Sequence, residues 1–270
     1  SADGSRDSAD GSAKRQARVA ADFGKAAGAY DSAARLQRQV GERLLEKMAP
    51  GQGGAVMDLG CGTGYFLPAL ARRLAPATLT AVDLSPQMLD YAREHRPVEA
   101  SFIAASAESV PLPESSQRRI FSSLMVQWCQ DLPAVAAEIH RLLAPGGEAL
   151  LSTLVEGTLG ELREAWHEAD PGVAHVNDFL APGELERQLR RVFPDARLDY
   201  ECIRLWYPQP MALLKELKTL GARHKDNGRR SATSPGRLRA LNRAYSRWRD
   251  PGQGVPASYQ VAYIRLHKPL

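Results

Sequence analysis

The fold is decided by Val56-Met57-Asp58-Leu59-Gly60-Cys61-Gly62-Thr63-Gly64-Tyr65, where an apolar strand ends, three alternate glycines follow and a helix begins. Such glycines let the chain turn tightly without Cβ atoms, so that a ligand can lie against backbone N–H groups. A dinucleotide-binding loop has the spacing G-x-G-x-x-G, but Tyr65 stands where its third glycine would be, and the chain has no G-x-x-x-x-G-K-[ST] phosphate loop. The stretch therefore favours a ligand without phosphate, such as S-adenosylmethionine. A glycine turn that binds nothing is the alternative.

A carboxylate in the next predicted strand supports the ligand. Residues 79–84 are an apolar run that ends near Asp83, 23 residues beyond Gly60. An acid at this place can accept both hydroxyl groups of a ribose. Asp83 could instead cap the next helix, but Ser85 is better placed to do so. Met88, on the apolar face of that helix, is predicted to lie over the adenine.

Further strands alternate with helices. We expect strands at 100–104, 120–124 and 148–154 and a helix at 132–143. This alternation predicts an α/β fold with a doubly wound, Rossmann-like sheet that binds ligands at the carboxyl ends of its strands. Further along the chain we expect helices at 159–169 and 182–192 and strands at 196–207 and 259–267, which complete a seven-stranded mixed sheet.

The domain organisation follows from length and composition. The chain has 270 residues, 44% of them hydrophobic, which fits one domain with a complete core at 13–270. We expect a flexible polar tail at 1–12, cap helices at 13–48 that break near Gly28, and a lid insertion at about 208–257 with helices at 211–220 and 235–249.

Several classes of protein are disfavoured. The chain has no run of 18 apolar residues, and its N-terminus has no basic segment followed by an apolar core, so we expect a cytoplasmic protein without a membrane partner. Its cysteines, Cys61, Cys129 and Cys202, form no C-x-x-C pair, which disfavours a metal site and disulfides.

Specific sequence blocks resemble the malonyl-acyl-carrier-protein O-methyltransferases of biotin synthesis. The resemblance spans nearly the whole chain, and it is carried by Phe23-Gly24-Lys25-Ala26-Ala27 with Tyr30, Leu36-Gln37-Arg38-Gln39, the glycine stretch, Asp83-Leu84-Ser85-Pro86-Gln87-Met88-Leu89, Val126-Gln127-Trp128-Cys129 and Leu217-Lys218-Thr219-Leu220-Gly221-Ala222-Arg223-His224. It implies an S-adenosylmethionine-dependent enzyme of the class I methyltransferase fold that methylates the malonyl carboxylate on an acyl carrier protein, so that fatty-acid synthesis can extend it toward pimeloyl.

The predicted cofactor-binding residues combine the glycine stretch with this resemblance. They are Tyr30, Asp58, Gly60, Cys61, Gly62, Gly64, Asp83, Leu84, Met88, Ser106, Ala107, Glu108 and Ser123. Related methyltransferases have an Asp at the position of Ser106 that meets the adenine amino group, and here the serine hydroxyl or the backbone near Ala107 is expected to replace it. Two further departures are Asp178, in place of an Arg, and Arg118-Arg119, in place of Phe-Asp.

Positive charge gathers in one segment. Residues 223–249 hold nine Lys or Arg and one acid, Asp226, although the whole chain has a net charge of only +4. This segment is a predicted docking surface for an acidic acyl carrier protein, with Arg229, Arg230, Arg237, Arg239, Arg243 and Arg247 as its contacts. A solvated face without a partner is the alternative. Nucleic acid is disfavoured, because Ser122-Ser123-Leu124-Met125 stands where nucleic-acid amino-methylating enzymes carry Asn or Asp before Pro-Pro-Tyr.

The chemistry needs positioning more than it needs a base. A carboxylate is ionised at neutral pH and can attack an electrophilic methyl group directly. The predicted catalytic residues are Tyr30, Lys218 and His224, and the predicted substrate residues are Trp128, His175 and Asn177. Each has a purely structural role as its alternative. Other interpretations of the chain are an O-methyltransferase for a small free dicarboxylic acid such as aconitate, and an inactive S-adenosylmethionine-binding protein.

Overall fold

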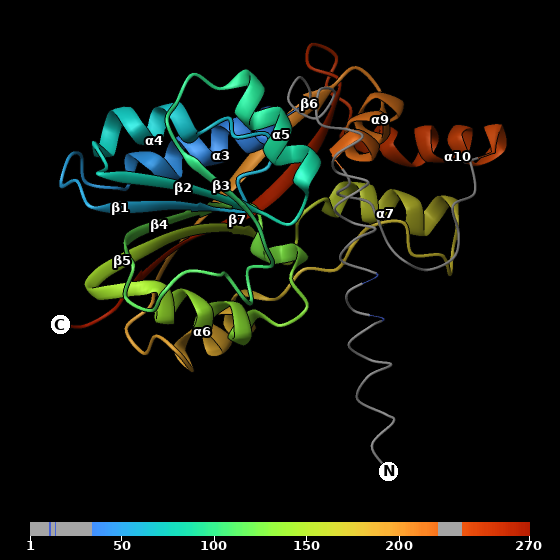
Figure 1. Cartoon of the computed structure of the whole chain (residues 1–270). Helices are drawn as coiled ribbons and strands as arrows, with labels where there is room; N and C mark the ends of the chain where they lie inside the picture. Colours follow the sequence, from blue (N-terminus) through green and yellow to red (C-terminus); the bar gives the residue numbers. More distant parts are fainter. Residues whose placement is uncertain (1–10, 12–13, 15–33, 221–233) are drawn as a thin grey trace.

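A seven-stranded sheet with helices on both of its faces forms the protein (Figure 1). The computed structural model describes residues 11, 14, 34–220 and 234–270. The strands are β1 (Ala55–Leu59), β2 (Thr78–Asp83), β3 (Ser101–Ala104), β4 (Gln117–Ser123), β5 (Leu143–Leu154), β6 (Arg197–Tyr207) and β7 (Val255–His267). The predicted tail at 1–12 apart from residue 11, most of the cap helices at 13–48 and residues 221–233 of the lid insertion lie outside the described part.

Helices connect these strands. They are α3 (Arg35–Glu46), α4 (Leu67–Leu74), α5 (Pro86–His95), α6 (Leu132–Leu142), α7 (Gly160–Ala169), α8 (Pro182–Arg190), α9 (Pro210–Leu220) and α10 (Pro235–Tyr245), with short 3₁₀ turns η1 (Val126–Trp128) and η2 (Ser246–Trp248). Among the described residues no helix is both long and apolar enough to cross a membrane.

The strand order is β3-β2-β1-β4-β5-β7-β6. β1 to β5 pair in parallel, whereas β7 runs antiparallel to both β5 and β6. The order reverses between β1 and β4, so the crevice beyond their carboxyl ends is the expected place for a ligand. The predicted seven-stranded mixed, doubly wound sheet is therefore confirmed.

Two apolar cores flank the sheet because successive residues of a strand point to opposite faces. In β1, Val56 joins the core beneath α3 and α4, while Met57 joins the core beneath α6 and α8. Both side chains are fully buried. This double burial explains why the parallel strands are continuous apolar runs rather than alternating ones. Figure 1 shows α3 and α4 on one side of the sheet and α6 on the other.

Three strands begin at least three residues before their predicted first residues, and the other predicted strand bounds differ by at most one residue. β5 begins at Leu143 instead of 148, and β7 begins at Val255 instead of 259. β7 is longer because its first residues pair with the end of β6, up to Tyr207 opposite Val255. β4 runs from Gln117 to Ser123, and the predicted last residue, Leu124, leaves the strand with a left-handed backbone (φ 53°).

Arg119, one of the departures from the family pattern, is a buried residue at the amino end of β4. Its guanidinium donates hydrogen bonds to the carbonyl oxygens of Ala49 (2.8 Å), Gly51 and Leu74 (3.4 Å). Leu74 ends α4, so the cation also lies at the negative end of a helix dipole. Arg119 is therefore a structural residue that closes the amino edge of the sheet, far from the carboxyl ends of the strands.

Candidate active site

The glycine loop after β1 leaves one side of its backbone open. Gly60 has φ 79°, and a Cβ at this position would lie 2.3 Å from Met125 Cγ, so the loop packs directly on the segment after β4. Gly62 has φ 54°, and a Cβ there would meet nothing within 4 Å. Both positions require glycine for their backbone conformation. The space beside Gly62 is where a ligand can approach the backbone.

Asp83, at the carboxyl end of β2, is tied to this loop. Its Oδ2 accepts a hydrogen bond from Gly62 N and its Oδ1 accepts one from Ser85 N, both at 2.9 Å. Burial raises the pKa of Asp83, and the hydrogen bonds from these N–H groups oppose that rise. Because a carboxylate has about four acceptor positions, it retains capacity for two ribose hydroxyls. The Gly62 N–H already donates its hydrogen bond to Asp83. It therefore contributes to the site by holding the Asp83 carboxylate rather than by binding a ligand directly.

Asp58 is a second buried acid in the site, with only 3% of its surface exposed. Burial and the nearby charge of Asp83 raise its pKa to about 8. Within the described part of the chain, no group donates a hydrogen bond to its carboxylate. A buried carboxylate without a partner is costly. The pair Asp58 and Asp83 therefore makes this pocket complementary to a ligand that brings positive charge.

Cys61 lies in the loop between these acids. Burial, followed by the charges of Asp83 and Asp58, raises the pKa of its thiol well above the usual range. A thiol that stays protonated is a poor nucleophile. Cys61 is thus a small residue of the loop rather than a reactive group.

The helix after Asp83 begins as the sequence predicts. Ser85 caps α5 by accepting a hydrogen bond from Met88 N (3.2 Å), and Pro86 occupies the first turn. Met88 itself is 1% exposed and Leu84 is half-buried. Met88 is therefore packed at the start of α5, beside the strand end that carries Asp83.

A tight turn follows β3 at the same edge. Ala104 pairs with Asp83 in the parallel register, and Ala105 N donates to the carbonyl oxygen of Asp83 (3.0 Å). Ser109 N then bonds to Ser106 O (3.1 Å), and Glu108 N bonds to Ser106 Oγ (3.2 Å). The turn that contains Ser106, Ala107 and Glu108 therefore begins beside the strand end that carries Asp83. The Ser106 hydroxyl keeps its own proton and one lone pair for a ligand.

The turn after β4 is strained and is held by hydroxyl groups. Ser123 Oγ lies 2.8 Å from Ser152 Oγ, and Leu124 N donates to both Ser152 Oγ (3.0 Å) and Ser152 O (2.9 Å). Gln127 donates to Leu124 O (3.0 Å) and accepts from Thr153 Oγ1 (3.1 Å). Backbone strain of this kind concentrates at functional sites. The side-chain amide of Gln127, in the Val-Gln-Trp-Cys block, thus stabilises this turn through hydrogen bonds to Leu124 and Thr153.

The predicted substrate residues lie on two segments. Trp128, in η1, is half-buried against the apolar core. His175 stacks on Trp166 of α7 (ring centroids 3.9 Å apart), and its Nε2 lies 2.9 Å from Asp170 Oδ2. Asn177 is 9% exposed, and its carbonyl oxygen accepts a hydrogen bond from Arg163 (2.7 Å). These contacts hold the His175 ring on α7.

The predicted catalytic residues are only partly described. Lys218 is exposed on α9, whereas Leu213 and Leu217 of the same helix are buried. Tyr30 and His224 lie outside the described residues. Lys218 therefore points away from the apolar face of its helix.

A polar network that the sequence analysis missed joins four distant segments, with two buried tyrosines at its centre and an exposed arginine at its edge. Tyr207 of β6 donates a hydrogen bond to Glu216 of α9, and Tyr259 of β7 lies 3.4 Å away, oxygen to oxygen. Arg35 of α3 pairs with Glu216 (3.3 Å), and its guanidinium lies over the Tyr207 ring. Burial raises the pKa of Tyr207. The network ties α3 to the β6–β7 hairpin, and no local spacing in the sequence could indicate it.

The described part of the basic segment divides into two sets. Arg237 lies 3.8 Å from Asp170 and Arg247 lies 3.8 Å from Glu168, so both are directed to acids near the end of α7. Arg239 and Arg243 are exposed one turn apart on α10, and within the described residues neither has an ion pair. Arg229 and Arg230 lie outside the described part.

Comparison with known proteins identifies relatives over nearly the whole chain. The family described as methyltransferase domain matches residues 57–151. The malonyl-[acyl-carrier protein] O-methyltransferase of Serratia marcescens is 44% identical over 97% of this chain and 99% of its own. The biotin biosynthesis bifunctional protein BioHC of Cellvibrio japonicus is 43% identical over 93% of this chain, and the match spans half of that longer protein.

Solved structures show the same fold at low sequence identity. The YcgJ protein of Bacillus subtilis aligns with a TM-score of 0.60 at 15% identity, over 86% of this chain and 99% of its own. Phosphoethanolamine N-methyltransferase 2 of Haemonchus contortus, solved with S-adenosylhomocysteine, aligns with a TM-score of 0.54 at 19% identity over 85% of this chain and 52% of its own. The glycine loop, the two acids beside it and the extent of the sequence match lead to one conclusion: the chain belongs to the malonyl-[acyl-carrier protein] O-methyltransferase family, whose members are S-adenosylmethionine-dependent enzymes.

Proposed function

We propose that this protein transfers a methyl group from S-adenosylmethionine to the free carboxylate of malonyl-acyl carrier protein, in biotin synthesis. The observation that supports this cofactor is the pair formed by the buried Asp58 and the half-buried Asp83, beside the open face of Gly62. S-adenosylmethionine brings an ammonium and a sulfonium, which compensate buried negative charge. The assignment of malonyl-acyl carrier protein as the substrate is based on the names of the relatives.

The residues present fit this cofactor. Asp83 would accept hydrogen bonds from the ribose hydroxyls, Asp58 would pair with the ammonium group, and the turn from Ser106 to Glu108 would meet the adenine edge. The cofactor supplies an electrophilic methyl group. The chain supplies the orientation of that group and the exclusion of water around it.

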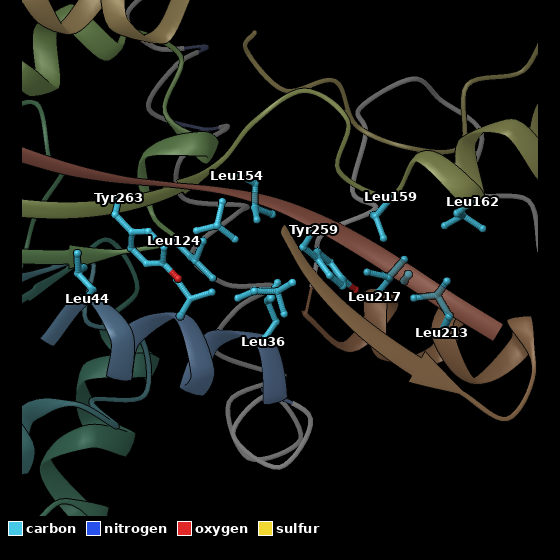
Figure 2. Close-up of a cluster of buried hydrophobic side chains, with 14 of the residues drawn as sticks. Leu36, Leu44, Leu124, Leu154, Leu159, Leu162, Leu213, Leu217, Tyr259 and Tyr263 are labelled. Atoms are coloured by element: carbon cyan, nitrogen blue, oxygen red, sulfur yellow. The ribbon is translucent and has the colours of Figure 1, made fainter. Parts of the chain in front are cut away.

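The apolar core on the α3 face of the sheet reaches the carboxyl ends of β4 and β5, where we expect it to exclude water (Figure 2). Leu36 of α3, Leu124, Leu154 and Leu159 are each at most 8% exposed and lie in one cluster with Leu217 of α9. A carboxylate that leaves water in such surroundings becomes a stronger nucleophile, because its lone pairs lose their hydrogen bonds. This favours direct attack on the methyl group without a general base.

The test of the proposal is methyl transfer from labelled S-adenosylmethionine to malonyl-acyl carrier protein, beside malonyl-coenzyme A and free malonate, at low and high salt. We expect fast labelling of the carrier protein that falls as salt rises. Preferential labelling of a free acid such as malonate or aconitate would favour a small-acid enzyme. Cofactor binding without labelling of any acid would indicate an inactive binding protein.

The exposed arginines of α10 allow a sharper prediction about docking. Reversing charge in Arg239→Glu together with Arg243→Glu is expected to raise KM for malonyl-acyl carrier protein about tenfold, since each exposed pair contributes up to about 1 kcal/mol. KM for malonyl-coenzyme A should stay within about twofold. The matched control is Arg72→Glu, an exposed arginine on α4, which lies far from α10 in Figure 1. Equal effects on both substrates would contradict docking on this helix.

A further inference from the structure

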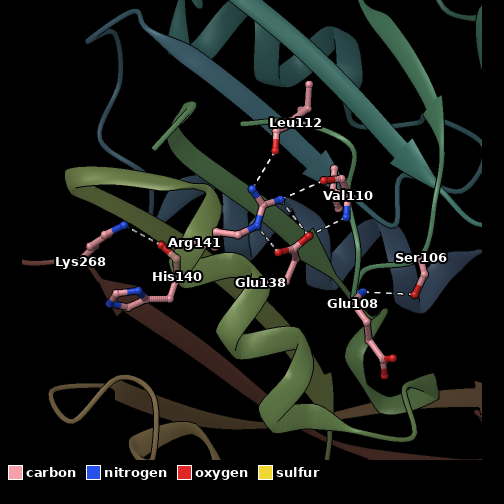
Figure 3. Close-up of polar contacts among 8 residues, drawn as sticks. All are labelled: Ser106, Glu108, Val110, Leu112, Glu138, His140, Arg141 and Lys268. Atoms are coloured by element: carbon pink, nitrogen blue, oxygen red, sulfur yellow. Dashed lines mark hydrogen bonds and ion pairs between the residues drawn. The ribbon is translucent and has the colours of Figure 1, made fainter. Parts of the chain in front are cut away.

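The loop between β3 and β4 is fastened to α6 by two side chains (Figure 3). Glu138 Oε2 accepts a hydrogen bond from Val110 N (2.6 Å). Arg141 donates to Val110 O (2.9 Å) and to Leu112 O (2.8 Å). Both polar groups of the Val110 backbone are thus bound by one pair of residues, and Ser115 N adds a bond to Arg141 O (2.8 Å).

The pair is itself rigid and charged. Arg141 donates two hydrogen bonds to Glu138, one to each carboxylate oxygen. The Glu138 side chain is only 9% exposed. The hydrogen bonds from Arg141, and that from Val110 N, lower the pKa of Glu138. Charge-assisted, bidentate bonds of this kind are stronger than neutral ones and fix geometry as well as distance.

This attachment controls the turn at the adenine end of the site. Val110 directly follows Ser109, whose N–H closes the turn on Ser106 O. At its other end, Ala105 N bonds to the carbonyl oxygen of Asp83. Hydrogen bonds therefore hold the turn at both ends: to the strand end that carries Asp83 on one side, and to Glu138 and Arg141 of α6 on the other. Figure 3 shows Ser106 and Glu108 on the same loop as Val110, which Glu138 and Arg141 hold.

We propose that Glu138 and Arg141 are positioning residues for adenine recognition: they hold the Ser106–Ser109 turn at the place where it meets the base. Neither side chain needs to touch the cofactor. The inference rests on the proposed function only in taking S-adenosylmethionine as the cofactor, and it does not depend on the methyl acceptor.

The experiment compares two ligands that differ only in the base. Dissociation constants for S-adenosylhomocysteine and for S-ribosylhomocysteine, which lacks adenine, are measured by calorimetry or competition with wild type and Arg141→Met. We expect the variant to bind S-adenosylhomocysteine about tenfold more weakly, and S-ribosylhomocysteine within about twofold of wild type. Arg187→Met is the matched control, because Arg187 forms the same Glu–Arg pair, three residues from Glu184, on the surface of α8.

Parallel losses for both ligands would overturn the proposal, because they would mean that the pair supports the whole domain. Unchanged affinity for both would overturn it as well. If Arg141→Met does not fold, Glu138→Gln keeps the size of the side chain and must still show a loss confined to S-adenosylhomocysteine. If wild type binds neither ligand, the cofactor assignment is refuted. If wild type binds both ligands and the variant binds them equally well, only the positioning role is refuted.

Discussion

Replacing Asp83 by asparagine is expected to weaken binding of S-adenosylmethionine at least about a hundredfold, because hydrogen bonds to a charged acceptor contribute roughly 1.5–3 kcal/mol each. The carboxylate accepts hydrogen bonds from Gly62 N and Ser85 N and keeps lone pairs for two ribose hydroxyls. An asparagine has one acceptor oxygen, and its NH₂ group would face one of these N–H donors. We therefore expect the variant both to lose hydrogen bonds to the ribose and to distort the glycine loop.

Calorimetric titration of the purified protein measures this loss. Asp90→Asn is the matched control, since Asp90 lies on α5 seven residues further along and is exposed beside Arg93. Its affinity should equal that of wild type. An Asp83→Asn protein that binds the cofactor within about threefold of wild type would refute the ribose role.

Cofactor affinity is expected to rise with pH through the titration of Asp58. The pKa of this carboxyl is about 8 in the ligand-free protein because it is buried beside Asp83. An ammonium group bound next to it favours the ionised form, so below pH 8 binding must release a proton. The affinity for S-adenosylhomocysteine should then increase about tenfold per pH unit between pH 6 and 8 and level off above.

Two measurements check this linkage. Calorimetry at pH 6 in buffers of different ionisation enthalpy should show about one proton released per ligand bound. In Asp58→Asn the affinity should be lower at pH 8 and should lose most of its dependence on pH. A wild-type affinity that is flat across this range would show that Asp58 does not pair with the ligand.

The same pKa has a consequence for stability with a definite sign. Asp58 is easier to protonate in the folded chain than in the unfolded one, so it costs no stability below its ordinary pKa near 4. The cost grows as pH rises toward 8 and is constant above. Asp58→Asn is therefore expected to raise the melting temperature of the ligand-free protein at pH 8 more than at pH 5.

The elements of the sheet could be predicted because buried parallel strands and amphipathic helices leave strong local patterns. The strand end at Asp83 and the cap at Ser85 follow from such patterns, and the structure has both. The beginning of β7 could not be predicted in this way, since Pro256 and two small residues hide a strand that exists because β6 lies beside it. The end of β4 before Leu124 could not be predicted for a similar reason. The left-handed backbone of Leu124 is held by hydrogen bonds to Ser152 on the neighbouring strand.

The residues of the candidate site could be predicted only where they lie in one short segment of the sequence. The glycine stretch and Asp83 are local features. The bond between them, from Gly62 N to Asp83, depends on the parallel pairing of β1 with β2. The network of Arg35, Tyr207 and Glu216 joins residues far apart in the chain, so only the tertiary fold shows it.

β7 follows β6 in the chain, yet it lies inside the sheet, between β5 and β6. During synthesis, therefore, β5 exposes an unpaired edge and β6 lacks its partner strand until Val255–His267 has emerged. Unpaired edges template aggregation, and the earlier parts of a chain fold first. The half of the sheet that carries Asp58 and Asp83 is thus formed while the tyrosine-rich hairpin is still missing. We expect a chain stalled at this stage to be prone to aggregation, although it already contains the cofactor-binding edge.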